Sequence, residues 1–199
     1  MSNDCGDGRL GSDGVCGDAD GLSAPSAIAL TPDGRWVFVA SRSASSLTWF
    51  ARDPATGALE QRGCLESFAW PGERCTTSPL LVGASGVAVS ADGTFVFVSA
   101  STSGAITTCR RDTGTGALRQ LACAASRVAQ PGACTPVTTL DGIRSIVLRG
   151  DGRNLYVAGN DSHSIAVFAS ALEVAARARL IRPTRHHVAV DPMSSPSRR

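Results

Sequence analysis

The sequence contains no lysine, because all 19 of its Lys and Arg positions are arginines. This absence excludes mechanisms that depend on a lysine, such as the phosphate-binding P-loop and Schiff-base catalysis. Aromatic residues make up only 5% and charged residues only 18% of the 199 positions, and the formal net charge is +2. So small a charge gives no indication of a nucleic acid or an acidic membrane surface as partner.

Long apolar runs are absent too. No stretch reaches the roughly 18 consecutive apolar residues of a transmembrane helix, so we expect no membrane span. The N-terminal segment has neither a basic region nor an apolar core, so we expect no signal peptide in the chain as it stands. The hydrophobic fraction of 43% is enough to bury a core, and the length predicts one domain or slightly more.

What the chain does have is an internal repeat. Asp-Gly pairs begin at positions 33, 92 and 151, spaced by 59 residues. Three cysteine pairs keep the same step, each with ten residues between its members: Cys5/Cys16, Cys64/Cys75 and Cys123/Cys134. Independent markers that agree on one period indicate a true structural repeat.

Each repeat unit has the pattern of several short β-strands. Apolar runs precede the Asp-Gly turns, where glycine supplies the positive φ that a tight hairpin requires. Runs rich in β-branched and aromatic residues follow the turns. The expected strands are 26–31, 85–90 and 144–149, then 35–41, 94–100 and 153–159, then 47–53, 106–112 and 165–168, and finally 57–64 and 116–123. Four antiparallel strands and a long loop, repeated along the chain, predict an all-β fold of propeller blades.

The segments TPDGRWVFVAS and SADGTFVFVSA, each with a TGAL farther on, resemble blades of the YVTN-repeat, lactonase-like β-propeller family. That family includes proteins similar to 6-phosphogluconolactonase and to carboxymuconate-cyclising enzymes. The resemblance covers roughly residues 17–168 and implies the propeller fold. It assigns no catalytic residue, because no matching catalytic motif is present on which to place one.

The repeat predicts a partial β-propeller of about 2.5–3 four-stranded antiparallel blades. Propellers generally close with about four to eight blades. We therefore expect the missing blades to come from the same polypeptide or from a homo-oligomer. The predicted units are an incomplete repeat with the Cys5/Cys16 loop at 1–21, blade 1 and its loop at 22–80, blade 2 and its loop at 81–139, and partial blade 3 at 140–168. A divergent, disordered tail is predicted at 169–199. Within this tail, segment 170–181 has the composition of a short helix.

The paired cysteines have three physical interpretations: disulfides, free thiols or half of a metal site. Zinc sites usually place about two to four residues between the first two ligands, so the spacing of ten favours disulfides. A disulfide across such a loop contributes roughly 2–3 kcal/mol. Disulfides imply an oxidising compartment, so we expect an extracellular or periplasmic protein. Cys109 aligns with Phe50 and Phe168, which predicts a buried, inert thiol.

Two N-terminal patterns have a functional and a plain interpretation. Residues 6–11, GDGRLG, match a dinucleotide-binding pattern but lack the strand before it and the helix after it, so we expect no cofactor there. An Asp-rich stretch offers hard oxygen ligands for calcium, yet the regular ligand series is missing and a solvated turn is favoured. Its acidic residues are Asp4, Asp7, Asp13, Asp18 and Asp20.

The turn Asp161-Ser162-His163 also has two interpretations. A propeller turn can line the mouth of the channel, where an Asp/His pair can act as acid and base. Turn chemistry explains the same residues without any function and is favoured. Asn160-Asp161-Ser162 is in addition a glycosylation sequon in a eukaryotic secretory pathway. His186 and His187 fall in the tail and are predicted to be solvent-exposed.

Three functions stay open. The favoured one is a binding or interaction scaffold from an exported lactonase-like propeller, with a small molecule or a protein of unknown identity bound at the propeller loops. The second is a part of a lactone-hydrolysing, 6-phosphogluconolactonase-like enzyme, and the third is a small propeller that self-associates. For the chain as it stands we favour no catalytic activity, no cofactor and no metal.

Overall fold

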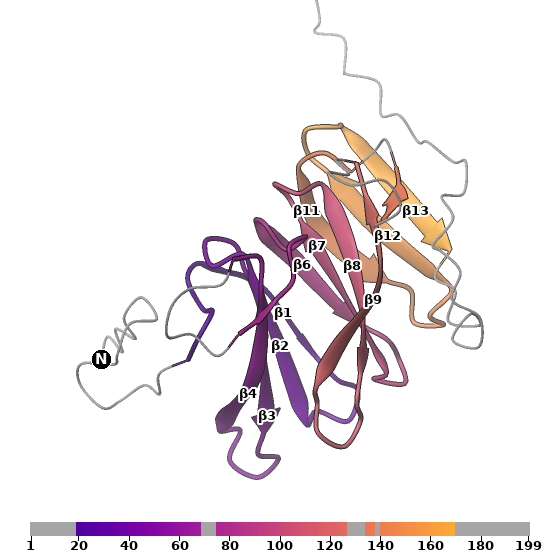
Figure 1. The fold of residues 1–199 in the computed structure, drawn as a ribbon. Coiled ribbons are helices and arrows are strands. Elements are labelled where there is room, and N and C mark those ends of the chain that lie inside the picture. Colours follow the sequence, from indigo (N-terminus) through magenta and orange to yellow (C-terminus); the bar gives the residue numbers. More distant parts are fainter. Residues whose placement is uncertain (1–18, 69–74, 127–133, 138–139, 170–199) are drawn as a thin grey trace, which may run out of the picture.

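The computed structural model describes residues 19–68, 75–126, 134–137 and 140–169, in which thirteen β-strands form three sheets (Figure 1). The sheets begin at residues 25, 84 and 143, so the 59-residue interval of the sequence recurs in the structure. The described residues contain no helix, which confirms the all-β prediction. No helix of the length and apolar character that a membrane span needs occurs in these ranges.

Within each sheet the strands follow chain order. The first sheet contains β1 (Pro25–Leu30), β2 (Trp36–Ser41), β3 (Ser46–Arg52), β4 (Leu59–Glu66) and β5 (Thr76–Thr77). The second contains β6 (Ala84–Val89), β7 (Phe95–Ala100), β8 (Ala105–Arg111), β9 (Leu118–Ala125) and β10 (Thr135–Pro136). The third contains β11 (Ile143–Leu148), β12 (Asn154–Gly159) and β13 (Ser164–Ala169).

The short strands β5 and β10 are the main departure from the sequence prediction, which has four strands per blade. Both pair in parallel with the strand before them, so that Leu65 lies opposite Thr76. The Cys64–Cys75 bridge brings the two Cα atoms to 4.6 Å, and the chain that leaves Cys75 therefore runs beside the chain that leaves Cys64. A two-residue polar strand has no hydrophobic pattern from which it could have been predicted.

The Asp-Gly turns that mark the repeat close the hairpins β1–β2, β6–β7 and β11–β12. In the first, Gly34 has a φ of 65° and its amide donates to Thr31 O at 2.8 Å. The Asp33 carboxylate accepts from the Arg35 amide at 3.0 Å. The same carboxylate bond forms at Asp92 and Asp151, so each Asp-Gly pair has a structural role in its turn.

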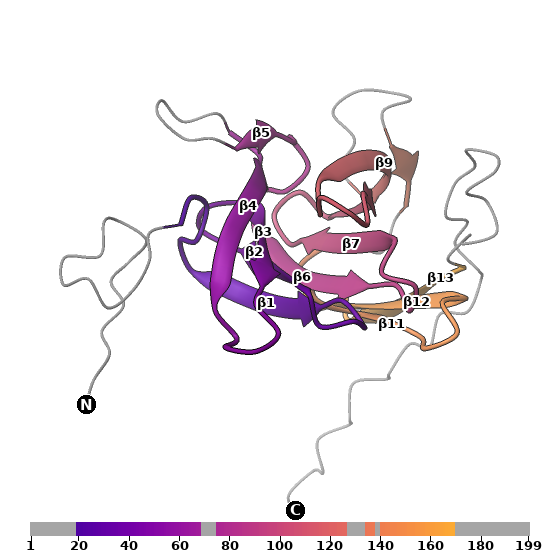
Figure 2. The same cartoon turned by 90° about the horizontal axis from the view of Figure 1, so that it is seen from below.

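The three sheets stand side by side like blades, with β1, β6 and β11 as neighbouring inner strands (Figure 2). One buried cluster joins the first two sheets: Trp36, Phe38, Ala40, Leu47, Trp49 and Leu65 with Leu81, Ala84, Val87, Val96, Val98 and Cys109. A second cluster joins the next two: Ala88, Phe95, Phe97, Ile106 and Ala124 with Val137, Leu140, Ile143, Ile146, Leu155, Val157 and Phe168. The core therefore lies between the sheets, and each sheet depends on its neighbours for burial.

Candidate functional site

One end of each sheet carries both the turn after its second strand and the segment that leads into its inner strand. We call it the loop end. In all three sheets the turn donates a backbone hydrogen bond to the lead-in segment: Arg42 N to Ala24 O at 2.9 Å, Ser101 N to Gly83 O at 2.9 Å, and Asn160 N to Gly142 O at 3.0 Å. In each sheet the turn and the start of the inner strand therefore lie side by side at the loop end, and we call these segments together the rim.

Every inner strand has a β-bulge at this end. The register shifts between Pro25 and Ala27 in β1, and at the equivalent places in β6 and β11. The residue inside each shift is Ser26, Ser85 and Arg144, respectively. Bulges occur often at barrel rims and beside functional sites, where they redirect a side chain.

The two serines at the bulges are used for structure. Ser26 Oγ lies 3.0 Å from Ala40 O and 2.9 Å from Ala84 O, so it connects the first two sheets. Ser85 Oγ donates to Ser99 O at 3.3 Å. The third bulge instead holds an exposed arginine, Arg144. Arg144 is thus the charged member of a row of three positions that runs across the inner strands.

The turn Asp161-Ser162-His163 lies at the same end of the third sheet. A Cβ atom added to Gly142 would lie 2.3 Å from Asp161 Cγ, so the carboxyl group rests directly on the chain two residues before Arg144. Asn160 Nδ2 donates to Asp161 Oδ1 at 2.9 Å, and His163 adopts a φ of 46°. The predicted turn therefore lies at the rim, against the segment that leads into the bulge with Arg144, a residue that the sequence reasoning missed.

A signal for Arg144 was present in the sequence. The aligned positions 26 and 85 are both serine, so an arginine at 144 breaks the repeat at a strand that otherwise keeps it. Departures from an internal repeat are the places where one unit can carry a function that the others lack.

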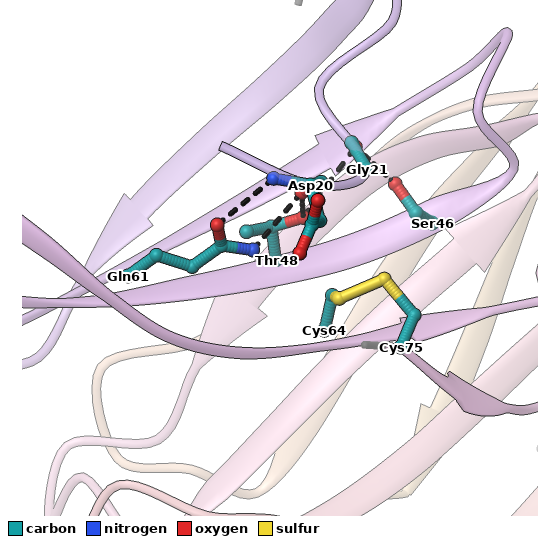
Figure 3. Close-up of a disulfide and its surroundings, with 7 residues drawn as sticks. All are labelled: Asp20, Gly21, Ser46, Thr48, Gln61, Cys64 and Cys75. Atoms are coloured by element: carbon teal, nitrogen blue, oxygen red, sulfur yellow. Dashed lines mark hydrogen bonds between the residues drawn. A yellow bond between two sulfur atoms is a disulfide. The ribbon is translucent and has the colours of Figure 1, made fainter. Parts of the chain in front are cut away.

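In the first sheet, polar side chains of β3 and β4 hold the segment that leads into the sheet (Figure 3). The Gln61 side-chain amide accepts from Asp20 N at 2.9 Å and donates to Asp20 O at 3.0 Å. Thr48 Oγ1 also donates to Asp20 O, at 3.2 Å. The backbone of Asp20 is thus attached to β3 and β4 beside the Cys64–Cys75 bridge. The other aspartates of the proposed calcium loop, Asp4, Asp7, Asp13 and Asp18, lie outside the described residues.

Two of the three expected disulfides are present, Cys64–Cys75 and Cys123–Cys134. Cys109 is a free thiol with no exposed surface, and burial raises its pKa to about 12. The thiol stays neutral at ordinary pH, as an inert core position requires. Cys5, Cys16, the 6–11 pattern, the 170–181 segment, His186 and His187 lie outside the described residues. Within the described ranges, no group of three or more His, Cys, Asp or Glu side chains gathers as metal ligands do.

Blade-like sheets with a 59-residue repeat, inner strands side by side and turns at one rim define a β-propeller architecture. Residues 13–135 match the family described as "Lactonase, 7-bladed beta-propeller", and the chain belongs to this family. Among curated proteins no sequence matches the chain.

Solved structures of similar fold agree with the propeller architecture. A Bacteroides fragilis protein classed as a 6-phosphogluconolactonase superposes with a TM-score of 0.62 at 17% identity, over 87% of this chain and 41% of that one. The periplasmic gluconolactonase of Pseudomonas aeruginosa superposes with a TM-score of 0.62 at 22% identity, over 88% of this chain and 42% of that one. The chain spans about two fifths of the length of these structures, and at such identities the likeness establishes the fold.

Proposed function

We propose that the chain supplies three consecutive blades of an exported lactonase-type propeller and acts as a binding scaffold for a hydroxylated organic acid at its loop end. The observation that carries this proposal is Arg144, exposed on a bulge of the inner strand where the other sheets place serine. A guanidinium group binds carboxylate or phosphate through two parallel hydrogen bonds.

The neighbouring turn fits the rest of such a ligand. Asp161 and His163 are exposed at the same rim, and a carboxylate there accepts hydrogen bonds from hydroxyl groups. A sugar acid presents both kinds of group, an anion for the arginine and hydroxyls for the aspartate. The two disulfides support an exported protein, since such bridges persist in oxidising compartments.

The experiment is a calorimetric titration of the chain with gluconate and with 6-phosphogluconate. The test variant is Arg144→Ser, which restores the residue of the other two bulges. Loss of one charged hydrogen-bond pair costs about 1.5–3 kcal/mol of binding free energy, so we expect affinity to fall roughly 10- to 150-fold. The matched variant is Arg149→Ser, because Arg149 is an exposed arginine directly after the same strand, paired there with Asp151.

We expect Arg149→Ser to bind both acids like the parent protein. Equal affinity in Arg144→Ser and the parent, or equal losses in both variants, contradicts a site at the rim. Absence of binding of either acid to the parent protein contradicts the proposed ligand class.

Lactone hydrolysis by a propeller that contains these three blades is the second candidate function. It is favoured by the family match and by the names of the two structural neighbours, together with the exposure of Asp161 and His163 in one turn at the rim. The expected result is opening of gluconolactone faster than in buffer, with loss of the excess rate in His163→Gln and Asp161→Asn and not in Arg149→Ser. A rate equal to that of buffer contradicts hydrolysis and leaves the binding experiment as a separate test.

A further inference from the structure

The first sheet holds a group of buried oxygen atoms at its loop end, beside Gly21. A Cβ atom added to Gly21 would lie 2.9 Å from Thr48 Oγ1, 3.2 Å from Ser46 Oγ and 3.2 Å from Glu66 Oε1. Ser46 and Thr48 have no exposed surface, and Glu66 is 2% exposed. Three buried oxygens from β3 and β4 therefore surround one point next to the segment that leads into β1. We call Gly21, Ser46, Thr48 and Glu66 the oxygen cradle.

The equivalent place in the second sheet is apolar. There Leu80 packs against Ala105 and Ala125 in one buried cluster, beside the Cys123–Cys134 bridge. Each of the three residues stands 59 positions after a member of the oxygen cradle. A leucine thus takes the place of the glycine, and alanines take the places of the serine and the glutamate. Three departures from the repeat at one place indicate that the first sheet carries something there that the second sheet lacks.

The hydroxyl hydrogens of the cradle are used on the backbone of the lead-in segment (Figure 3). Ser46 Oγ donates to Gly21 O, and Thr48 Oγ1 donates to Asp20 O at 3.2 Å. A hydroxyl group has a single hydrogen, so toward the point beside Gly21 both oxygens present lone pairs. The ionised carboxylate of Glu66 presents only lone pairs as well. All three oxygens around this point are therefore acceptors, which is the environment that a cation requires.

The kind of oxygen indicates the kind of cation. Carboxylate and hydroxyl oxygens are hard ligands, which suit calcium and magnesium better than softer metals. Magnesium demands a near-ideal octahedron at about 2.0–2.1 Å, whereas calcium accepts an irregular set of oxygens at about 2.3–2.6 Å. The three cradle oxygens lie 2.9–3.2 Å from their common point, so their spacing favours the larger ion.

We propose that the oxygen cradle binds a calcium ion, with Ser46 Oγ, Thr48 Oγ1 and Glu66 Oε1 as ligands. The ion holds the lead-in segment on β3 and β4 beside the Cys64–Cys75 bridge (Figure 3), and water molecules complete its coordination. The site includes a single carboxylate and is therefore no cluster of acidic side chains. Its ligands come from β3 and β4 and include none of the aspartates of the N-terminal Asp-rich stretch. The proposal is independent of the ligand at the rim.

The experiment is a calorimetric titration of the full chain with calcium chloride, after a chelator has removed bound metal and with the disulfides intact. Sites with few negative charges are weak, so we expect a dissociation constant of about 0.1–1 mM. An ion that binds only the folded state stabilises it. The midpoint of thermal unfolding should therefore rise by roughly 3–10 °C at about 10 mM calcium.

The main variant is Glu66→Gln, which removes the negative charge and keeps the size of the side chain. It should weaken calcium binding about 10-fold or more and remove most of the thermal shift. The matched variant is Glu60→Gln, because Glu60 is an exposed glutamate of the same strand, paired with Arg62. Glu60→Gln should bind calcium like the parent protein.

A second variant keeps the test decisive if Glu66→Gln does not fold. Ser46→Ala installs the residue that the second sheet has at this place and removes one ligand, so it should weaken calcium binding several-fold. Circular dichroism in the absence of calcium verifies that each variant retains the strand content of the parent. The proposal is overturned if the parent does not bind calcium, or if both Glu66→Gln and Ser46→Ala bind it as tightly as the parent. The second result assigns the ion to another place, such as the Asp-rich stretch.

Discussion

At the scale of single residues, two equivalent glycines distinguish the stability cost of a strained backbone from that of a steric clash. Gly57 and Gly116 are repeat equivalents with φ values of 79° and 75°. A Cβ atom at Gly116 would lie 2.0 Å from the Trp36 ring, whereas at Gly57 the nearest atom is Arg52 Nη2 at 3.8 Å. Gly57→Ala should therefore lower the free energy of unfolding by about 1–2 kcal/mol, because alanine is strained in the left-handed backbone conformation.

Gly116→Ala should cost this amount plus roughly 1–3 kcal/mol, because the methyl group displaces the indole that joins two sheets. Urea unfolding of both variants measures the difference. Equal losses in the two variants would mean that the close approach of the second sheet to Trp36 does not exist in solution.

Cys109 links the pH dependence of stability to a single residue. Burial raises its pKa from 9.0 to about 12, so the folded state disfavours the thiolate while the unfolded chain forms it freely. The stability that the neutral thiol contributes is complete below pH 9 and is lost as the pH rises toward 12. At pH 10 the free energy of unfolding should be about 1.4 kcal/mol lower than at pH 8 on this account. Cys109→Val should remove that part of the decrease, and an unchanged pH profile in the variant contradicts the assignment.

At the scale of elements, β5 depends on a covalent bond. It has two residues, Thr76 and Thr77, both exposed, and it pairs with β4 directly after the Cys64–Cys75 bridge. The double change Cys64→Ser and Cys75→Ser should lower stability by roughly 2–3 kcal/mol. It should also remove the exchange protection of the Ser78 amide, which donates to Glu66 O at 2.5 Å.

The second sheet of the same molecule is the internal reference. Val137 N donates to Ala125 O at 3.0 Å in the equivalent place, and its bridge stays intact in the variant. Amide exchange followed by NMR should show loss at Ser78 and retention at Val137. Retention at both positions indicates that β5 holds without the disulfide.

The repeated elements could be located from the sequence because the same signals occur in each unit. The strand expected at 35–41 is β2, Trp36–Ser41, and the one expected at 47–53 is β3, Ser46–Arg52. Both strands are buried along nearly their whole length, so their signal in the sequence is a short run rich in β-branched and aromatic residues. The bulges and the parallel strands could not be predicted this way, because a register shift at Ser26 depends on bonds to Ala40 and Ala84, residues distant in the sequence.

The candidate site was predictable only in part for the same reason. Asp161 and His163 lie in a turn that the repeat places correctly, and this follows from strand spacing alone. The contact of Asp161 with the segment that leads into Arg144 depends on Gly142, whose missing side chain admits the carboxyl group. Such a contact between two loops of one sheet requires the folded register and cannot be obtained from periodicity.

At the scale of the whole molecule, the three sheets form a linear array. The inner strand β6 contacts both β1 and β11, so the middle sheet has two interfaces and each outer sheet has one. Arrays of this kind gain their cooperativity from nearest-neighbour contacts, and weakening one contact lets an end unit unfold separately. Two of the three tryptophans, Trp36 and Trp49, lie in the first sheet, and Trp70 lies outside the described residues. In a Trp70→Phe background, tryptophan fluorescence therefore reports on one end of the array.

Phe168 is 1% exposed and lies between the second and third sheets. Phe168→Ala should cost about 3–5 kcal/mol and uncouple the third sheet. Circular dichroism, which detects all three sheets, should then begin to change at a lower urea concentration than tryptophan fluorescence. Phe38→Ala removes a fully buried side chain from the interface between the first two sheets. In this variant the fluorescence change should instead begin at the lower urea concentration. If the two probes coincide in Phe168→Ala, the array unfolds as one unit and the second interface does not limit its cooperativity.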